Sequence, residues 1–321
     1  MSASFRIDPH SAPTVPAFPQ LGAAGASGED FLPGEYRLIE KLDQADSFEL
    51  WKGVDGNGRP LLIKLATSAS AEASTAFAAQ ARVLVSLTHR SVVRLLGHGE
   101  ARDGRAFLAL EWLEGYSLRR LIEERGAGMP PTDAIRLLMP IASALVLAHD
   151  RGFVHGGVNA DAVFIEVRSD GDVIPKLIDF STAKRTAPSV PPTPSNLPLA
   201  PRSNEPTERV STSVDIRGFA ATIFYAITCR APFDSRSKRA ELVPRTGLSQ
   251  RDAVLWRILA EGLAPATSAR FNTLHAFARE LATWAELRGL DADVTGSPIS
   301  VRWLHATAIQ RPERREGKVR S

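Results

Sequence analysis

Residues 153–180 read FVHGGVNADAVFIEVRSDGDVIPKLIDF, and this stretch decides the fold. Its two apolar runs, AVFIEV and VIPKLI, stand on either side of a polar turn and predict a pair of short strands. The segment before it, residues 132–152, has the apolar spacing of an amphipathic helix. A helix, a loop and a strand pair therefore follow one another. The stretch also contains the polar residues His155, Asp161 and Asp179.

The chain on either side of this stretch divides into two lobes. Residues 36–113 are strand-like, with a hairpin turn at Asp55-Gly56-Asn57-Gly58 and one helical segment at 72–87. Residues 114–290 are mostly helical. Helices are expected there at 132–152, 215–229, 250–263 and 271–287. The sequence thus predicts an α+β, bilobal fold, with a small β-rich N-lobe carrying one helix, a larger helical C-lobe, and a pocket at the seam.

The two ends differ from the body of the chain. Residues 1–35 are rich in Pro, Ala and Gly and predict a disordered arm, with order beginning at Tyr36. Residues 291–321 predict a basic tail, because 302–321 hold six Arg or Lys against two Glu. The body is nearly neutral despite the net charge of +3, so a nucleic-acid partner is not expected.

Composition excludes several further classes. No apolar run reaches the roughly 18 residues of a membrane span. The single cysteine, Cys229, expected inside a helix, excludes a disulfide framework and fits a reducing compartment. We therefore expect a cytoplasmic protein, with secretion through the N-terminal arm as the alternative.

Seven short motifs in this order resemble the eukaryotic-like Ser/Thr protein kinases of bacteria. They are LLIKL, LTHRSVVRL, LALEWLEGYSL, HGGVNADAVFI, LIDFSTAK, SVDIRGF and LAPATSARF, and the resemblance as a whole covers about residues 36–287. The resemblance implies the bilobal kinase fold, ATP and Mg²⁺ as cofactors, and a protein partner or substrate.

The resemblance also assigns roles to individual residues. Lys64 would contact ATP and Asp179 would hold the metal, with Asp161 as a substitute ligand or base. Leu62, Leu110 and Glu111 would line the nucleotide site, with Leu110 as gatekeeper. Lys64 and Asp179 have a second interpretation, a structural ion pair across the cleft, which we favour.

The phosphate-binding loop of the family is missing its glycines. Asp43, Ala45 and Phe48 stand at the three glycine positions of LDQADSFEL, and Asp46 and Glu49 add charge. Glycine is needed there because backbone N–H groups must approach the phosphates closely. Carboxylates at this tip would instead repel a triphosphate. The alternative interpretation, which we favour, is a plain β-hairpin tip with solvated acidic side chains.

The catalytic loop departs from the family as well. Its base aspartate is Gly157 and its metal-binding asparagine is Ala162, while Gly156 and Asn159 replace the arginine and the lysine. The helix glutamate that pairs with the lysine is Gln80, a neutral amide. Loss of a general base alone typically lowers a rate 10²–10⁴-fold.

The residues that support the fold are retained. His155 is expected to bond to the helix that carries Asp215, Phe180 to stack between the lobes, and Arg270 to be the structural arginine of the late segment. The family's tie to Arg270 would come from Glu205, since Arg202 stands where the glutamate should be.

The loop 181–213 is rich in proline and contains Ser189, Thr193 and Ser195. It predicts a stiff exposed loop, with a polyproline II docking segment or a phosphorylation site as alternatives.

These observations favour a pseudokinase: a degenerate member of the family that regulates or scaffolds bacterial signalling, with no intact catalytic residue and no cofactor. Its partner would be an active kinase, a kinase substrate, or a signalling or secretion assembly. The alternative is a divergent ATP-dependent Ser/Thr kinase, or another nucleotide transferase, that acts through Lys64 and Asp179. A third reading, a small-molecule phosphotransferase, rests on His155-Gly156 alone.

Overall fold

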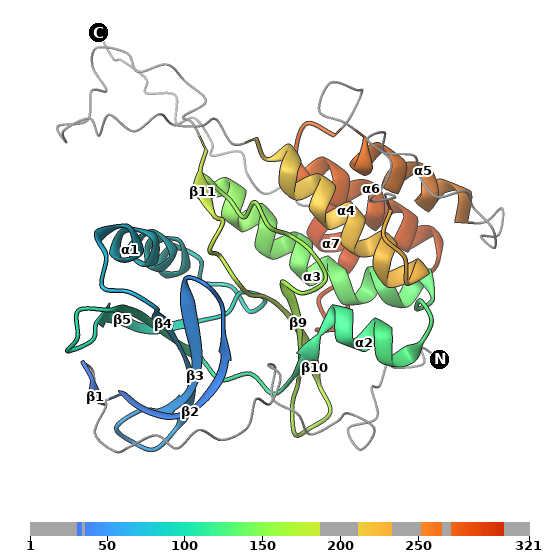
Figure 1. Cartoon of the computed structure of the whole chain (residues 1–321). Coiled ribbons are helices and arrows are strands. Elements are labelled where there is room, and N and C mark those ends of the chain that lie inside the picture. The colour runs from blue at the N-terminus through green and yellow to red at the C-terminus, as the bar shows by residue number, and fades with distance from the viewer. Residues whose placement is uncertain (1–30, 34–35, 187–210, 233–251, 265–270, 305–321) are drawn as a thin grey trace, which may run out of the picture.

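A computed structural model of the chain describes residues 31–33, 36–186, 211–232, 252–264 and 271–304. These residues form the expected α+β, bilobal arrangement, with a β-sheet N-lobe and a helical C-lobe (Figure 1). The site residue Arg270 and the loop residues Ser189, Thr193, Ser195, Arg202 and Glu205 lie outside the described residues.

The N-lobe is a six-stranded antiparallel sheet in the order β1-β2-β3-β4-β6-β5. Its strands are β1 (Phe31–Leu32), β2 (Tyr36–Gln44), β3 (Phe48–Val54), β4 (Pro60–Ala66), β5 (Leu95–Glu100) and β6 (Ala106–Glu111). β4 and β6 lie at the centre of the sheet and are almost wholly apolar, as strands buried on both faces must be. The register pairs Leu62 with Leu110 and Lys64 with Leu108, so the lysine lies on a strand that is bonded on both sides.

Helix α1 (Ala71–Ser86) packs on this sheet. It begins at Ser70, whose side chain accepts a hydrogen bond from the Ala73 N–H, and it buries Phe77, Gln80, Ala81, Val83 and Leu84. Gln80 is therefore the polar member of an apolar helix face, and it points toward Lys64.

The C-lobe is built around α3 (Pro131–Asp150), which buries twelve residues. Around it lie α2 (Leu118–Arg125), α4 (Ser213–Thr228), α5 (Ala253–Leu263), α6 (Leu274–Leu287) and α7 (Ile299–Trp303). In the described part of the chain, α3 is the helix long and apolar enough to cross a membrane, and 67% of its apolar window is buried inside the protein. Its apolar character is thus explained by its place in the core.

Short strands at the lobe boundary carry the loop that decides the fold. β7 (Gly115–Ser117), β9 (Val163–Val167) and β10 (Val173–Leu177) form a three-stranded sheet, and β8 (Phe153–Val154) pairs with β11 (Lys184–Arg185). The two lobes are joined here by backbone bonds, because the Leu177 carbonyl accepts from the Val93 N–H and the Leu177 N–H donates to Ser91.

Packed structure extends beyond both of the expected ends of the folded region, residues 36 and 290. Order begins before Tyr36, since β1 pairs with β2 and Leu32 is buried. Packed structure also continues beyond residue 290, because Ile299 and Trp303 of α7 are buried against the C-lobe. The sequence concealed this second extension because the charge of 302–321 dominated the segment.

Cys229 also differs from expectation. It is the residue that ends α4, with a left-handed φ of 56°, and it is partly exposed.

Candidate functional site

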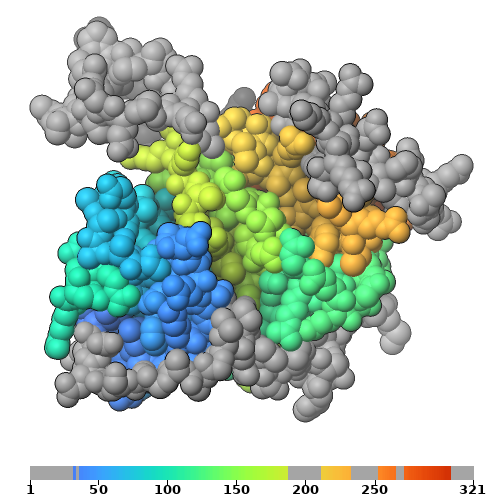
Figure 2. Space-filling view, viewed as in Figure 1, coloured from blue at the N-terminus to red at the C-terminus, as the bar shows by residue number. Residues whose placement is uncertain are grey.

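A cavity of about 270 Å³ lies between the lobes. It is lined by Asp43, Phe48, Leu50, Leu62, Lys64, Gln80, Val93, Leu110, Glu111, Trp112, Leu113, Asn159, Asp161, Ala162, Phe164, Ile178 and Asp179. Figure 2 shows a recess between the N-lobe hairpin (blue) and the C-lobe around α2 (green). Leu62, Leu110 and Glu111, expected in the nucleotide site, all lie on its wall.

Lys64 and Asp179 meet at one end of this cavity. Lys64 Nζ lies 3.4 Å from Asp179 Oδ1 and 3.4 Å from Gln80 Oε1. Asp179 follows β10 with a left-handed φ of 55°, a conformation that Asp tolerates better than most residues. The geometry is that of an interlobe ion pair supplemented by a neutral amide.

Burial and charge act against each other in this pair. Burial lowers the pKa of Lys64, although the charge of Asp179 opposes that shift. Burial alone would raise the pKa of Asp179, but the charge of Lys64 and hydrogen bonds from Ser181 and Lys64 hold that pKa below its ordinary value. Asp179 keeps 53% of its side-chain surface exposed, so this carboxylate remains in contact with the cavity.

Phe48 covers the lysine. It begins β3 directly after the hairpin tip, and its ring centroid lies 4.2 Å from Lys64 Nζ. Ammonium groups are attracted to aromatic faces at this distance. The third glycine position of the expected phosphate loop is therefore occupied by a ring that contacts the cation itself.

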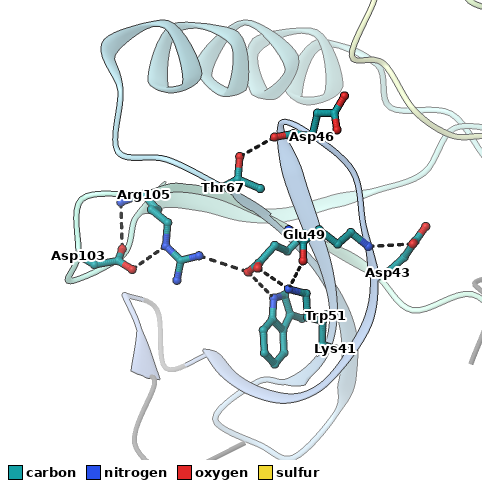
Figure 3. Close-up of polar contacts among 9 residues, drawn as sticks. Lys41, Asp43, Asp46, Glu49, Trp51, Thr67, Asp103 and Arg105 are labelled. Atoms are coloured by element: carbon teal, nitrogen blue, oxygen red, sulfur yellow. Dashed lines mark hydrogen bonds and ion pairs between the residues drawn. The ribbon is translucent and has the colours of Figure 1, made fainter. Parts of the chain in front are cut away.

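Glu49 turns to the other face of the hairpin, as strand alternation requires (Figure 3). It accepts hydrogen bonds from Lys41 Nζ at 2.5 Å and Trp51 Nε1 at 3.1 Å, and it lies 3.2 Å from the guanidinium of Arg105. Partial burial opposes its charge, but these bonds and the two cations hold the pKa of Glu49 below its ordinary value.

Of the three carboxylates near the hairpin tip, Glu49 is therefore directed away from the phosphate site. Asp46 is exposed at the tip, and of the three only Asp43 lines the cavity.

Thr182 packs closely against the two glycines of the loop that corresponds to the catalytic loop, Gly156 and Gly157. A side chain at Gly157 would place Cβ 2.7 Å from Thr182 Oγ1, and one at Gly156 would place it 2.9 Å from the Thr182 carbonyl. Thr182 Oγ1 itself donates to the His155 carbonyl. The space in which a base side chain would begin is thus taken by a hydroxyl group with its own bonding role, which the sequence did not indicate.

Asp161 is held by a partner that the sequence analysis missed. Arg119 Nε lies 2.8 Å and 2.7 Å from the two carboxylate oxygens of Asp161. The backbone N–H of Asp161 donates to Asn159 Oδ1. Asn159 also accepts from the Ala162 N–H. Asp161 is on the cavity wall, but its charge is already balanced at the surface. Nothing in the spacing of the sequence links Arg119 to this loop.

Asp215 organises the loop from below. Its fully buried carboxylate accepts from the backbone N–H groups of His155 and Gly156 and from His149 Nε2, each at 2.8 Å. His155 thus bonds to the anchoring helix through its backbone, while its Nε2 lies 3.2 Å from the Ile178 carbonyl.

The ring of His155 supports the loop in a second way. It packs edge-to-face on Phe180 at 4.6 Å, with Phe180 fully buried. Burial lowers the pKa of His155 despite the charge of Asp215, as expected for a packing histidine. His149 is a further supporting residue, for which the sequence carried no signal.

Glu111 lies at the end of β6, where the chain passes from the N-lobe to the C-lobe (the hinge), and its side chain is already bonded. Its Oε1 accepts from Lys176 Nζ at 2.6 Å and from the Arg94 N–H at 2.9 Å. Glu166 lies 3.9 Å from the same lysine, and burial raises the pKa of Glu166 against the charges of Lys176 and Arg168. The side chain of Glu111 therefore fastens the hinge to β10.

The acidic side chains on the cavity wall that could hold a magnesium–nucleotide complex are already engaged with cations, which disfavours such a complex. Among the described residues, no group of three or more His, Cys, Asp or Glu side chains could hold a metal ion. Mg²⁺ is usually held by one or two carboxylates together with substrate phosphates. Here Asp179 is paired with Lys64, Asp161 with Arg119, and Ala162 offers no ligand atom.

Comparisons with known proteins agree with this architecture. The protein kinase domain family matches residues 51–263. The chain is 30% identical over 230 residues to the serine/threonine-protein kinase pkn2 of Myxococcus xanthus, covering 68% of this chain and 26% of that protein. It is 34% identical over 161 residues to PknL of Mycobacterium tuberculosis, covering 49% of this chain and 39% of that protein.

A solved structure supports the fold. The kinase domain of M. tuberculosis PknI superposes with a TM-score of 0.61 at 22% identity, covering 81% of this chain and 100% of that one. The chain therefore belongs to the protein kinase family, and its relatives are bacterial Ser/Thr kinases. It spans between a quarter and two fifths of the length of the two curated relatives above.

Proposed function

We propose that this protein is a pseudokinase, which binds protein partners through a kinase fold and transfers little or no phosphate. The observation that carries the proposal is the loop at Gly157, where the base side chain is absent and Thr182 occupies the space in which it would start. Positioning and charge neutralisation supply nearly all of the catalysis in phosphoryl transfer. A kinase cleft without the base, the second metal ligand and the phosphate loop lacks most of the groups that make these contributions.

The role that fits such a chain is regulatory. It would occupy the docking surface of an active kinase or of a kinase substrate, or scaffold a signalling or secretion assembly. We also propose the cytoplasm as its location, which agrees with the single cysteine.

The direct test is a phosphotransfer assay. Pure protein is incubated with labelled ATP and either Mg²⁺ or Mn²⁺, alone and with a generic protein substrate. We expect no label above that of the Lys64→Ala and Asp179→Ala variants. Label transfer that both substitutions abolish would overturn the proposal.

The alternative, a divergent Ser/Thr kinase, is favoured by one observation. Lys64 and Asp179 both line the accessible cavity, and their charged groups lie 3.4 Å apart. Such an enzyme would show a nucleotide-dependent and metal-dependent rise in melting temperature, which mass action makes large at saturating ligand. No shift at millimolar ATP with either metal would exclude it.

A further inference from the structure

The cavity between the lobes is small and mostly apolar. Its volume of about 270 Å³ is at the lower end of the roughly 300–1,000 Å³ typical of small-molecule sites. Aliphatic side chains from both lobes and the rings of Phe48, Trp112 and Phe164 form most of its wall. Such a wall favours a flat aromatic ligand, because its rings can stack on another ring and its apolar part gives polar groups no partner in exchange for their lost hydration.

The charges on the wall are unfavourable for an anion. One lysine, Lys64, lines the cavity together with four carboxylates: Asp43, Glu111, Asp161 and Asp179. Lys64 is already matched by Asp179, while Arg119 and Lys176 match Asp161 and Glu111 from outside the lining. Asp43 adds a further negative charge at the hairpin. A phosphorylated ligand would therefore meet repulsion in a cleft of reduced dielectric.

Two backbone donors beside the hairpin tip are also already engaged. The Ala45 N–H donates to the Phe48 carbonyl at 2.8 Å, and the Gln44 N–H donates to Asp43 Oδ1 at 2.8 Å. Anion-binding loops instead direct successive backbone N–H groups at the ligand. Since Phe48 covers the Lys64 ammonium at 4.2 Å, the remaining cation is shielded as well.

We infer that this cleft binds an uncharged, flat heteroaromatic molecule and discriminates against its phosphorylated forms, without need of a divalent metal. The inference deepens the proposed function and rests on it, since it gives the non-catalytic cleft a ligand of its own. Phosphate on the ligand then weakens binding, through Asp43 and Phe48.

The test is a titration series in which only the phosphate number changes. Adenosine, AMP and ATP are titrated into the full chain by calorimetry, each with MgCl₂ and again with EDTA. We expect adenosine to bind at least about tenfold more tightly than ATP, a difference of about 1.4 kcal/mol, with no effect of the metal. Tighter binding of ATP with Mg²⁺, or no binding of adenosine at millimolar concentration, would overturn the inference.

A matched pair of variants locates the discrimination. Asp43→Asn removes the carboxylate on the cavity wall, and Asp46→Asn makes the same chemical change at the exposed tip. We expect Asp43→Asn to raise ATP affinity about threefold to tenfold and to leave adenosine unchanged, with a smaller effect from Asp46→Asn. Equal effects of the two variants would contradict a role for the wall.

A blocking variant checks that the ligand enters the cavity. Leu62→Trp fills the wall opposite the C-lobe and should abolish adenosine binding, with circular dichroism as the control for folding. Because the two Asp variants alter a hairpin tip, they test the inference even if Leu62→Trp does not fold.

The two proposals fail separately. Phosphate transfer from labelled ATP would overturn the pseudokinase function whatever the affinity for adenosine. Tighter binding of ATP without transfer would overturn only the inference about the ligand.

Discussion

The two walls of the cleft depart from the kinase motifs in different ways. On the C-lobe side a side chain is missing: Gly157 and Ala162 carry no functional groups, and Thr182 lies against the loop at Gly157. On the N-lobe side the departure is a replacement, in which Phe48 and Asp43 project into the place of a glycine loop.

The two walls also differ in the contacts that hold them in place. The C-lobe loop keeps its buried support, since Asp215 binds two backbone N–H groups and one histidine beneath it. The N-lobe hairpin is instead held by ion pairs on its outer face, around Glu49. One wall is a retained scaffold and the other is a rebuilt surface, so mutations in the two should differ in size.

The largest effect is expected at the scaffold. Asp215→Ala leaves two backbone N–H groups and His149 without their buried partner, and should lower the free energy of unfolding by about 3–5 kcal/mol. Asp161→Ala, on the same wall but 57% exposed, is the control and should change it by less than about 1 kcal/mol. Urea denaturation measures both. Similar losses from the two variants would contradict the special role of the buried Asp215 carboxylate.

The next effect concerns the junction behind the cleft, where a loop of the N-lobe meets the C-lobe. His89 accepts from the Ser91 N–H at Nδ1, and its Nε2 lies 2.8 Å from Ser143 Oγ, which Arg302 also contacts. Burial first, and then the charge of Arg302, lower the pKa of His89 to about 4 from 6.5.

Stability should therefore fall as the pH drops from 6.5 to about 4, because the unfolded chain takes up a proton there that folded His89 refuses. Partial exposure limits the effect to about 1–3 kcal/mol. Denaturation curves across this window, for the natural chain and for His89→Gln, isolate the contribution. The prediction is refuted if the stability of both proteins falls equally steeply with decreasing pH.

A smaller effect should follow from restoring the missing groups. Gly157→Asp with Ala162→Asn should give no phosphate transfer, because the N-lobe wall still excludes the nucleotide phosphates. It should also lower the free energy of unfolding by about 1–2 kcal/mol, owing to the 2.7 Å approach to Thr182 Oγ1. Adding Thr182→Ala should recover part of that loss in a double-mutant cycle. Additive effects would show that the contact is relaxed elsewhere.

The smallest effect is expected on the rebuilt wall. Glu49→Gln removes the charge that Lys41 and Arg105 share, and should lower the free energy of unfolding by about 1 kcal/mol, less at high salt. Thermal denaturation at two salt concentrations checks it, with Glu40→Gln on the neighbouring strand as control. A loss as large as that of Asp215→Ala would make this wall a scaffold too.

Much of the fold could be predicted from the sequence because its signals are local. Alternation in β2, the helical spacing of α3 and the order of the motifs each need only a short window of residues. The pairing of Lys64 with Asp179 was also within reach, because the resemblance placed both in one cleft. These are features that periodicity or motif order can encode.

The remainder of the site depends on contacts that no local pattern encodes. Arg119 reaches Asp161 from α2, and Thr182 closes over Gly157 through backbone geometry. The orientation of Glu49 depends on the alternation of side chains along β3, which a count of charged residues does not include. The direction of a side chain therefore has to be known before a charged residue can be assigned to the site.

The segment 291–304 has a consequence for the order of folding. Arg90, in the loop after α1, donates to the Thr295 carbonyl 205 residues further along the chain, and Arg302 contacts the Ser143 side chain that His89 holds. During synthesis from the N-terminus, this loop leaves the ribosome long before its C-terminal partners exist. The N-lobe can form its sheet early, but the junction behind the cleft is completed only when α7 emerges.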